Sequence, residues 1–166
     1  LLDRIKLCML PPPQRRSLPY ECYWEDSILT QEQERIFSNQ WLGLGRSDRL
    51  ENPGEYEAFE LCGQALVLIR NQDKELRLYA NTCRHRGAKL LDGTGQCQAI
   101  SCPFHGWTYS LDGNLKHAKA MAENSSFDFA DNSLIEYKLK ELQGFLFGFL
   151  GNTPTDLSNQ LGNFSE

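Results

Sequence analysis

Four residues between positions 83 and 105 carry side chains that bind transition metals. Cys83 and His85 lie in one short segment and Cys102 and His105 in a second, so each segment offers one thiol and one imidazole. All four could surround a single zinc ion, or they could hold a two-iron cluster with the cysteines on one iron and the histidines on the other. Zinc fingers usually pair Cys with Cys and His with His, whereas each segment here is mixed. The pattern therefore favours the two-iron cluster over zinc and over unliganded buried cysteines.

The two segments read C-R-H-R-G from Cys83 and C-P-F-H-G-W from Cys102. This pair of motifs resembles the Rieske domain in the large (alpha) subunit of ring-hydroxylating, or Rieske non-haem iron, oxygenases. The resemblance implies a Rieske [2Fe–2S] cluster whose ligands are Cys83, His85, Cys102 and His105. It also implies close neighbours of the cluster at Arg86, Gly87, Phe104, Gly106 and Trp107.

The residues around the candidate ligands have expected roles of their own. Gly87 and Gly106 follow the two histidines, where the backbone needs a positive φ or a close approach to the cluster. Phe104 and Trp107 would keep the cluster dry, a role compatible with ordinary core packing. High-potential Rieske proteins resemble this motif but carry an extra cysteine in each loop, where Ala88 and Phe104 stand here. We therefore expect a reduction potential toward the lower end of the Rieske range of about −150 to +300 mV.

Three basic residues, Arg84, Arg86 and Lys89, crowd the first segment of a chain whose net charge is −5. They could dock an acidic electron donor or an adjacent catalytic domain. Local salt bridges within the domain are an equally good explanation.

Short apolar runs separated by turns predict a mainly β fold. The Cys62-Gly63 pair predicts a tight turn, Asp112-Gly113 a two-residue hairpin loop, residues 92–95 a turn, and residues 121–132 a polar surface loop. The expected strands lie at residues 56–61, 64–70, 75–80, 134–142 and 144–150. Together with the motif, this indicates an antiparallel β-sandwich of the Rieske [2Fe–2S] type, with two cluster-binding hairpin loops, preceded by an N-terminal helix.

The helix is expected at residues 31–40. Thr30 and Gln33 form a capping-box signature, and Ile36, Phe37 and Trp41 recur at helical spacing, so this helix would cover a hydrophobic core. The segment from residue 20 to residue 45 also resembles the lead-in of oxygenase large subunits, which free-standing Rieske ferredoxins lack.

Composition limits the other possibilities. The 166 residues carry a net charge of −5, which argues against a nucleic-acid partner, and no run of eighteen apolar residues predicts a membrane span. The remaining cysteines are expected to be free thiols, mostly packed, at Cys8, Cys22, Cys62 and Cys97. A labile cluster and unpaired thiols suit a reducing compartment, so we expect a cytoplasmic protein, although the chain starts at Leu1 and an upstream targeting segment is not excluded.

The expected organisation has four parts: an extended arm at residues 1–19, a helical lead-in at 20–40, the Rieske domain at 41–150, and a connection to an absent catalytic domain at 151–166. The resemblance implies a mononuclear Fe(II) held by two histidines and a carboxylate. We expect this iron in the further domain, because His117 is the only histidine outside the motif. His117 itself is expected to be an ordinary loop histidine.

The resemblance implies the electron-transfer portion of a mono- or dioxygenase, of a kind that includes enzymes of aromatic hydrocarbon catabolism. It would relay single electrons from a ferredoxin or reductase, through His105, to an iron that activates O2. The full-length subunit would form a homotrimer or an alpha3beta3 assembly. The alternative is a stand-alone Rieske ferredoxin-like carrier, and the substrate is not indicated.

Overall fold

The structure, a computed structural model, describes residues 1–119, 121 and 124–162. Within these residues ten strands are present: β1 (Trp41–Arg46), β2 (Glu55–Leu61), β3 (Gln64–Arg70), β4 (Leu76–Ala80), β5 (Thr94–Gln96), β6 (Ile100–Ser101), β7 (Thr108–Tyr109), β8 (Leu115–His117), β9 (Glu136–Leu142) and β10 (Phe145–Phe149). The α-helices of the same residues are α1 (Leu2–Lys6), α2 (Asp26–Arg35) and α3 (Leu157–Leu161). Short 3₁₀ helices lie at Leu7–Met9, Tyr20–Tyr23, Phe37–Asn39, Ser47–Arg49 and Ala130–Asn132.

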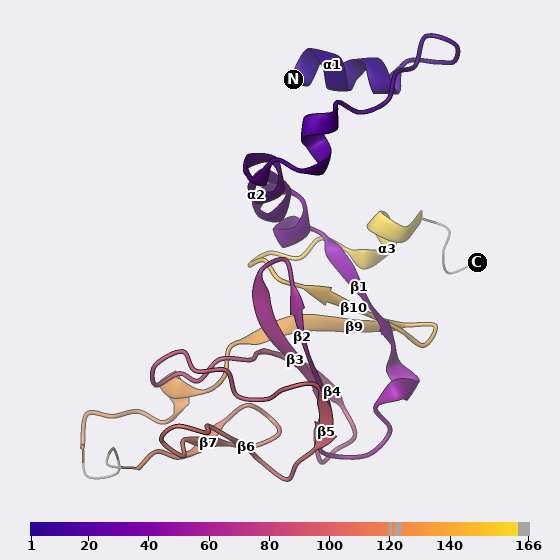
Figure 1. Ribbon diagram of the computed structural model, residues 1–166. Helices are drawn as coiled ribbons and strands as arrows, with labels where there is room; N and C mark the ends of the chain where they lie inside the picture. Colours follow the sequence, from indigo (N-terminus) through magenta and orange to yellow (C-terminus); the bar gives the residue numbers. More distant parts are fainter. Residues whose placement is uncertain (120, 122–123, 163–166) are drawn as a thin grey trace.

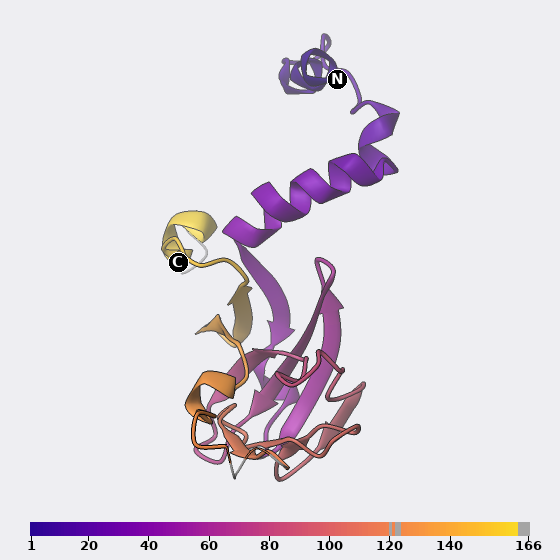
Figure 2. The same cartoon turned by 90° about the vertical axis from the view of Figure 1, so that its left-hand side faces the viewer.

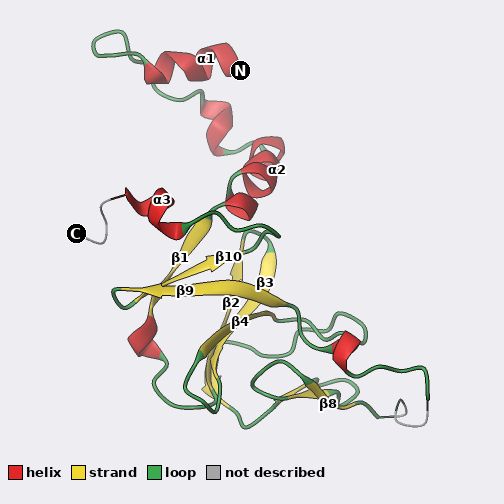
Figure 3. Cartoon of the chain, turned by 180° about the vertical axis from the view of Figure 1, so that it is seen from behind, coloured by secondary structure: helices red, strands yellow, loops and turns green. Residues whose placement is uncertain are grey.

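The strands form two antiparallel sheets. The larger has the order β1-β10-β9-β4-β3-β2-β5 and curls on itself, and the smaller has the order β6-β7-β8 (Figure 1). The prediction of a mainly β, antiparallel sandwich is confirmed. Figure 3 shows helices only at the two ends of the chain and in short turns between strands. No helix among the described residues is long and apolar enough to cross a bilayer.

Strand β3 organises the core because both of its faces are buried. Leu66 and Leu68 pack on one side with residues of β1, β9 and β10. Val67 and Ile69 pack on the other side with the residues that surround the small sheet. A continuous apolar run is expected for a strand covered on both faces.

The tight turns follow the sequence. Cys62 and Gly63 join β2 to β3 with φ values of 53° and 74°, the backbone of a two-residue hairpin turn. Gln143 and Gly144 join β9 to β10 with φ values of 53° and 77°. The prediction for Cys62-Gly63 is therefore confirmed.

The Asp112-Gly113 hairpin differs from its prediction. The Ser110 N–H donates to the Asn114 carbonyl and the Gly113 N–H to the Ser110 carbonyl, at 2.8 and 3.0 Å. The loop therefore has three residues, Leu111 to Gly113, with Gly113 at a φ of 77°. A type I turn followed by a left-handed glycine is the usual three-residue solution.

The predicted turn at residues 92–95 is only half correct. Gly93 turns the chain with a φ of 56°, but Thr94–Gln96 forms β5, which pairs with the start of β2. Gly95 lies beneath Tyr56, where an added Cβ would come within 2.7 Å of the tyrosine hydroxyl oxygen. Here glycine is needed for close approach between strands, not for a turn.

The N-terminal helix also differs from its prediction. Helix α2 begins at Asp26, and the Thr30 hydroxyl donates to the Asp26 carbonyl inside the helix at 2.9 Å instead of capping it. No residue of α2 is buried, and Ile36 is exposed. Figure 2 shows α2 rising away from the sheets. The prediction that this helix covers the core of residues 41–150 is therefore wrong.

Helix α3 packs against the start of β1. The Gln160 side-chain amide donates to the Trp41 carbonyl at 2.8 Å and accepts from the Trp41 N–H at 2.9 Å. The Trp41 indole N–H donates to the Thr155 carbonyl at 2.7 Å. Leu157 is buried against Trp41 and Phe149.

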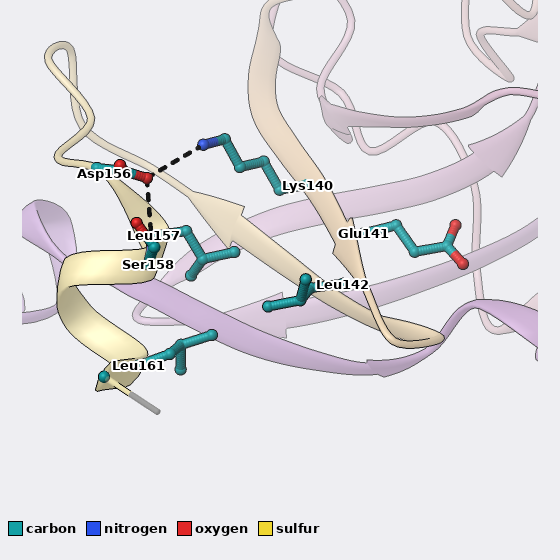
Figure 4. Close-up of a pocket in the computed structure, with 8 residues that line it drawn as sticks. Lys140, Glu141, Leu142, Asp156, Leu157, Ser158 and Leu161 are labelled. Carbon is teal, nitrogen blue, oxygen red and sulfur yellow. Dashed lines mark hydrogen bonds and ion pairs between the residues drawn. The ribbon is translucent and has the colours of Figure 1, made fainter. Parts of the chain in front are cut away.

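A pocket of about 200 Å³ lies between α3 and β9 and is lined by Leu142, Leu157 and Leu161, which Figure 4 labels. Lys140 and Asp156 form an ion pair at 3.8 Å beside it. Helix α3 lies at the end of the large sheet far from β6 and β7 (Figure 1). This pocket is therefore separate from the Cys/His segments.

Candidate metal centre

The first segment is a loop closed by its own backbone. The Cys83 N–H donates to the Ala88 carbonyl at 2.8 Å, and the Gly87 N–H donates to the Cys83 carbonyl at 2.9 Å. Below the loop, the buried Asn81 side chain donates to the Leu91 carbonyl at 2.8 Å and accepts from the Leu91 N–H at 3.0 Å. Asn81 thus joins the segment that enters the loop to the segment that leaves it.

The second segment repeats this backbone pattern. The Cys102 N–H donates to the Trp107 carbonyl at 2.8 Å, and the Gly106 N–H donates to the Cys102 carbonyl at 3.1 Å. This loop is the tip of the β6–β7 hairpin, as the sequence predicts. The first loop is flanked by an isolated β-bridge between Thr82 and Lys89 in place of two paired strands.

Gly87 and Gly106 have φ values of 71° and 68°. A Cβ added at either residue would have no atom within 4 Å. Glycine is therefore favoured by the left-handed backbone, one of the two predicted reasons. The other reason, close approach to the cluster, stays a prediction.

The two loops bring all four predicted ligands to one pocket. Cys83 and Cys102 are only 3% and 4% exposed. The imidazoles of His85 and His105 lie nearly perpendicular, with ring centroids 4.8 Å apart. The pocket measures about 290 Å³ and is lined by Cys83, His85, Arg86, Ala88, Cys102, Phe104 and His105.

The donor atoms suit a bound metal group. Nδ1 of His85 is buried and has no hydrogen-bond partner, which is costly unless something binds that nitrogen. In the described residues, no three His, Cys, Asp or Glu side chains are placed to hold one ion. Zinc needs four ligands around one point, whereas a two-iron cluster takes two ligands at each iron. The pairing of one thiol and one imidazole in each loop fits a two-iron cluster, and the assignment of each ligand stays a prediction.

The electrostatic surroundings of Cys102 and His85 favour the protonation states that bind metals. Burial raises the pKa of Cys102, but hydrogen bonds from the backbone N–H groups of His105 and Phe104 outweigh burial, so the pKa lies below its usual value. Burial, with smaller contributions from Arg86 and His105, lowers the pKa of His85. A thiolate and a neutral imidazole are the forms that coordinate metals.

Tyr109 lies against the first cysteine, a contact that the sequence analysis did not predict. This buried residue of β7 places its hydroxyl 3.4 Å from Cys83 Sγ. The same hydroxyl accepts the Arg84 N–H at 3.0 Å, so its own hydrogen is available to the sulfur. Burial raises the pKa of Tyr109, with Cys83 as a further cause, so the phenol stays protonated.

Trp107 and Phe104 differ in how deeply they are buried. Trp107 is buried and stacks on His85, with ring centroids 4.9 Å apart and planes 14° apart. Phe104 lines the pocket but is 73% exposed. Trp107 is therefore packed in the core and Phe104 is not, because Phe104 stands at the outer tip of its loop. The predicted role of both residues in keeping the cluster dry stays a prediction.

Comparison with known proteins identifies this architecture. The family described as the Rieske [2Fe–2S] domain matches residues 40–138, which is more than half of the chain. The chain belongs to the Rieske [2Fe–2S] domain family. The cofactor of the family is the cluster that the ligand pattern predicts.

The relatives of this Rieske domain are oxygenase subunits. The chain is 34% identical over 151 residues to the carnitine monooxygenase oxygenase subunit of Escherichia coli (strain K12), covering 90% of this chain and 40% of the relative. It is 29% identical over 142 residues to the benzene 1,2-dioxygenase subunit alpha of Pseudomonas putida, covering 84% and 32%. A solved structure of a quaternary ammonium Rieske monooxygenase, reported with insights into carnitine oxidation by gut microbiota and inter-subunit electron transfer, superposes with a TM-score of 0.83 at 34% identity, covering 89% and 40%.

These matches confirm the resemblance to the alpha subunits of Rieske oxygenases. The chain spans about 40% of the length of the carnitine monooxygenase subunit it matches. The 151-residue alignment is longer than the span of the domain match, so it includes residues outside 40–138.

The basic residues of the first Rieske loop divide into two kinds. Lys89 forms an ion pair with Asp92. Arg84 and Arg86 are exposed, and no ion pair is formed by either among the described residues. The local explanation therefore holds for Lys89 only.

The other cysteines and the last histidine lie elsewhere. All of the remaining cysteines are free thiols and partly buried, as expected: Cys8, Cys22, Cys62 and Cys97. His117 is exposed at the end of β8 and does not line the pocket. It is therefore a strand residue, not the loop histidine expected.

Proposed function

We propose that residues 41–150 hold a Rieske [2Fe–2S] cluster, with Cys83 and Cys102 as ligands of one iron and His85 and His105 as ligands of the other. One observation carries the assignment: two buried thiols and two imidazoles from separate loops meet at a single pocket. The partnerless Nδ1 of His85 adds support, since a buried nitrogen of this kind needs a partner.

When bound, such a cluster accepts and releases one electron at a time. Burial of Cys83 and Cys102 excludes water from the sulfur side. Backbone N–H groups of Phe104 and His105 stabilise negative charge on Cys102. His105 is exposed, so it is the imidazole that an electron acceptor could reach.

The whole protein, in this proposal, is the alpha subunit of a Rieske non-haem iron mono- or dioxygenase. Residues 1–166 would receive electrons from a ferredoxin or reductase and pass them to a mononuclear iron in a further domain, joined through residues 151–166. Support comes from the oxygenase subunits, whose alignment with the chain extends beyond the domain match. Because the similar monooxygenase structure is described with inter-subunit electron transfer, a homotrimer or an alpha3beta3 complex is the assembly to test.

The relatives differ in the class of substrate that their names give. One relative acts on carnitine and another on benzene, by their names. Identity is higher to the carnitine monooxygenase subunit, at 34% against 29%. We therefore place a quaternary amine ahead of an aromatic hydrocarbon in an assay of the full-length protein.

Partner docking is proposed at the pocket rim. Arg84 and Arg86 carry charges that no acidic side chain of the described residues pairs, and Arg86 lines the same pocket as the exposed Phe104. An acidic partner surface with room for one aromatic ring would complement this group. Reversing the charge of either arginine should slow reduction by the donor and weaken its dependence on ionic strength.

The ligand assignment is tested by electron paramagnetic resonance of the dithionite-reduced protein. We expect visible absorbance and an averaged g-value of mixed His/Cys ligation. Cys102→Ser should abolish the absorbance, whereas Cys97→Ser, a matched change outside the pocket, should retain it. His105→Ala and His117→Ala form a second matched pair. A colourless zinc protein, or equal loss in Cys97→Ser, would refute the assignment.

The stand-alone ferredoxin-like carrier is not favoured, because the relatives named above are oxygenase subunits. Intact mass and sequence of the native gene product separate the two functions. Further residues with two closely spaced histidines and a distant aspartate indicate the oxygenase.

A further inference from the structure

Two phenylalanines extend the stack that begins at His85. The Phe127 ring meets Trp107 edge to face, with centroids 5.5 Å apart and planes at 80°. Phe129 meets Phe127 in the same way, at 5.2 Å and 86°. Four rings therefore lie in sequence from the pocket to the loop that follows β8.

The loop that carries these rings is polar in sequence and was expected to be only a surface loop. Both phenylalanines are partly buried against the core cluster that includes Cys83 and Cys102. The prediction missed this packing because apolar side chains two apart in a polar segment have no clear period.

Short hydrogen-bonded turns fix the loop on either side of the rings. The Asn124 side chain accepts from the Ser126 N–H at 3.0 Å and from its hydroxyl at 2.7 Å. The Asp128 side chain accepts from the Ala130 N–H at 2.7 Å, which starts the 3₁₀ helix there. Asx-type turns of this kind hold a backbone without a regular element.

The two candidate imidazoles therefore have unequal surroundings. Trp107 stacks on one face of His85 at 4.9 Å, and Trp107 is in turn contacted by Phe127 at 5.5 Å. His105 is exposed, and its other aromatic neighbour, Phe104, lies at 6.5 Å. The orientation of His85 is set by a chain of rings, whereas that of His105 is not.

From this asymmetry we propose that Phe127 is a positioning residue for His85, acting through Trp107, with Phe129 as its outer support. The inference rests on the proposed cluster and deepens it. Because a metal-bound imidazole is oriented by the groups behind it, loosening Trp107 would let the His85 ring rotate about its bond to the iron.

The test substitutes Phe127→Leu in the cluster-loaded protein. Leucine keeps apolar volume but removes the aromatic edge that faces Trp107. Phe59→Leu is the matched control, because Phe59 packs in the other core cluster. Phe127→Tyr is the conservative variant, since it keeps the ring. The readouts are the g-values of the reduced protein and the rate at which visible absorbance bleaches at fixed temperature.

We expect Phe127→Leu to change the separation of the g-values and to bleach about 2- to 10-fold faster, the change in rate that matches the loss of one edge-to-face pair. Phe59→Leu and Phe127→Tyr should keep the wild-type spectrum. Wild-type g-values in Phe127→Leu, or the same change in Phe59→Leu, would overturn the inference.

Two further outcomes are decided in advance. If Phe127→Leu does not load a cluster, Phe129→Leu is tested in its place, because it removes only the outer support. Changed g-values in Phe129→Leu support the inference, and wild-type g-values overturn it. Failure of the proposed function is seen separately, because the wild-type protein would then lack the averaged g-value of mixed His/Cys ligation.

Discussion

Replacing Tyr109 by phenylalanine removes one oxygen atom from the wall of the candidate cluster site. The hydroxyl stands 3.4 Å from Cys83 Sγ and accepts the Arg84 N–H at 3.0 Å. Tyr109 is completely buried, so water cannot replace the lost group without a rearrangement. The substitution keeps the ring and therefore isolates the two hydrogen bonds.

The expected shift follows from the charge on the sulfur. A hydrogen bond to a charged group is worth about 1.5–3 kcal/mol. Reduction adds negative charge to the site, and if this strengthens the bond by about 1 kcal/mol, its loss lowers a one-electron potential by about 40 mV. The free energy of unfolding should fall by about 1–2 kcal/mol, because the two hydrogen bonds of the hydroxyl are lost.

The assay is spectroelectrochemical titration of the loaded protein, with thermal unfolding as the second measurement. Tyr137→Phe is the control, because its hydroxyl bonds to Gln64 on the large sheet. Both variants should lose similar stability, but only Tyr109→Phe should have a lower potential. Equal potentials in the two variants would refute the reasoning that the hydroxyl acts on the sulfur.

Three more changes have expected outcomes in urea unfolding. Asn81→Ala should lower the free energy of unfolding by about 2–4 kcal/mol, because the N–H and the carbonyl of Leu91 both lose a buried partner. An unchanged urea midpoint would contradict this. Gly87→Ala should cost only about 1–2 kcal/mol, because the left-handed backbone is strained for alanine but the space is open. A larger loss would show that the loop lacks the room the structure gives it. Gln160→Ala should cost about 1–2 kcal/mol, through two hydrogen bonds to the first residue of β1, and should leave the visible spectrum unchanged.

Features set by neighbouring residues were predictable from the sequence. The β2–β3 turn is one example, because Cys62-Gly63 and its flanking strands specify a hairpin locally. The β5 strand was not predictable in this way. Gly95 indicates a turn in the sequence, and its contact with Tyr56 of β2 is known only from the structure. The start of α2 was missed because apolar spacing near Ile36 implied a core that this helix does not touch.

The candidate site divides in the same way. Its four proposed ligands stand in two short motifs, so the residue types and the resemblance of these motifs to the Rieske domain pointed to them. Tyr109 lies two residues after Trp107, but its contact with Cys83 depends on the packing of β7 against the first loop. Asn81 carried no signal beyond its place before the loop, and Phe127 lay in a segment without periodicity.

The unequal surroundings of the two imidazoles give the site a direction. Trp107, which Phe127 contacts edge to face, covers one face of His85. On the side of His105, the surface is open, because His105 is exposed and the neighbouring Phe104 ring is exposed as well. Since a partner must approach closely to exchange an electron, contact is expected at His105. If so, a bulky change at Phe104 should slow electron exchange with a partner while leaving the g-values as in the wild type, whereas changes behind His85 should alter the g-values first.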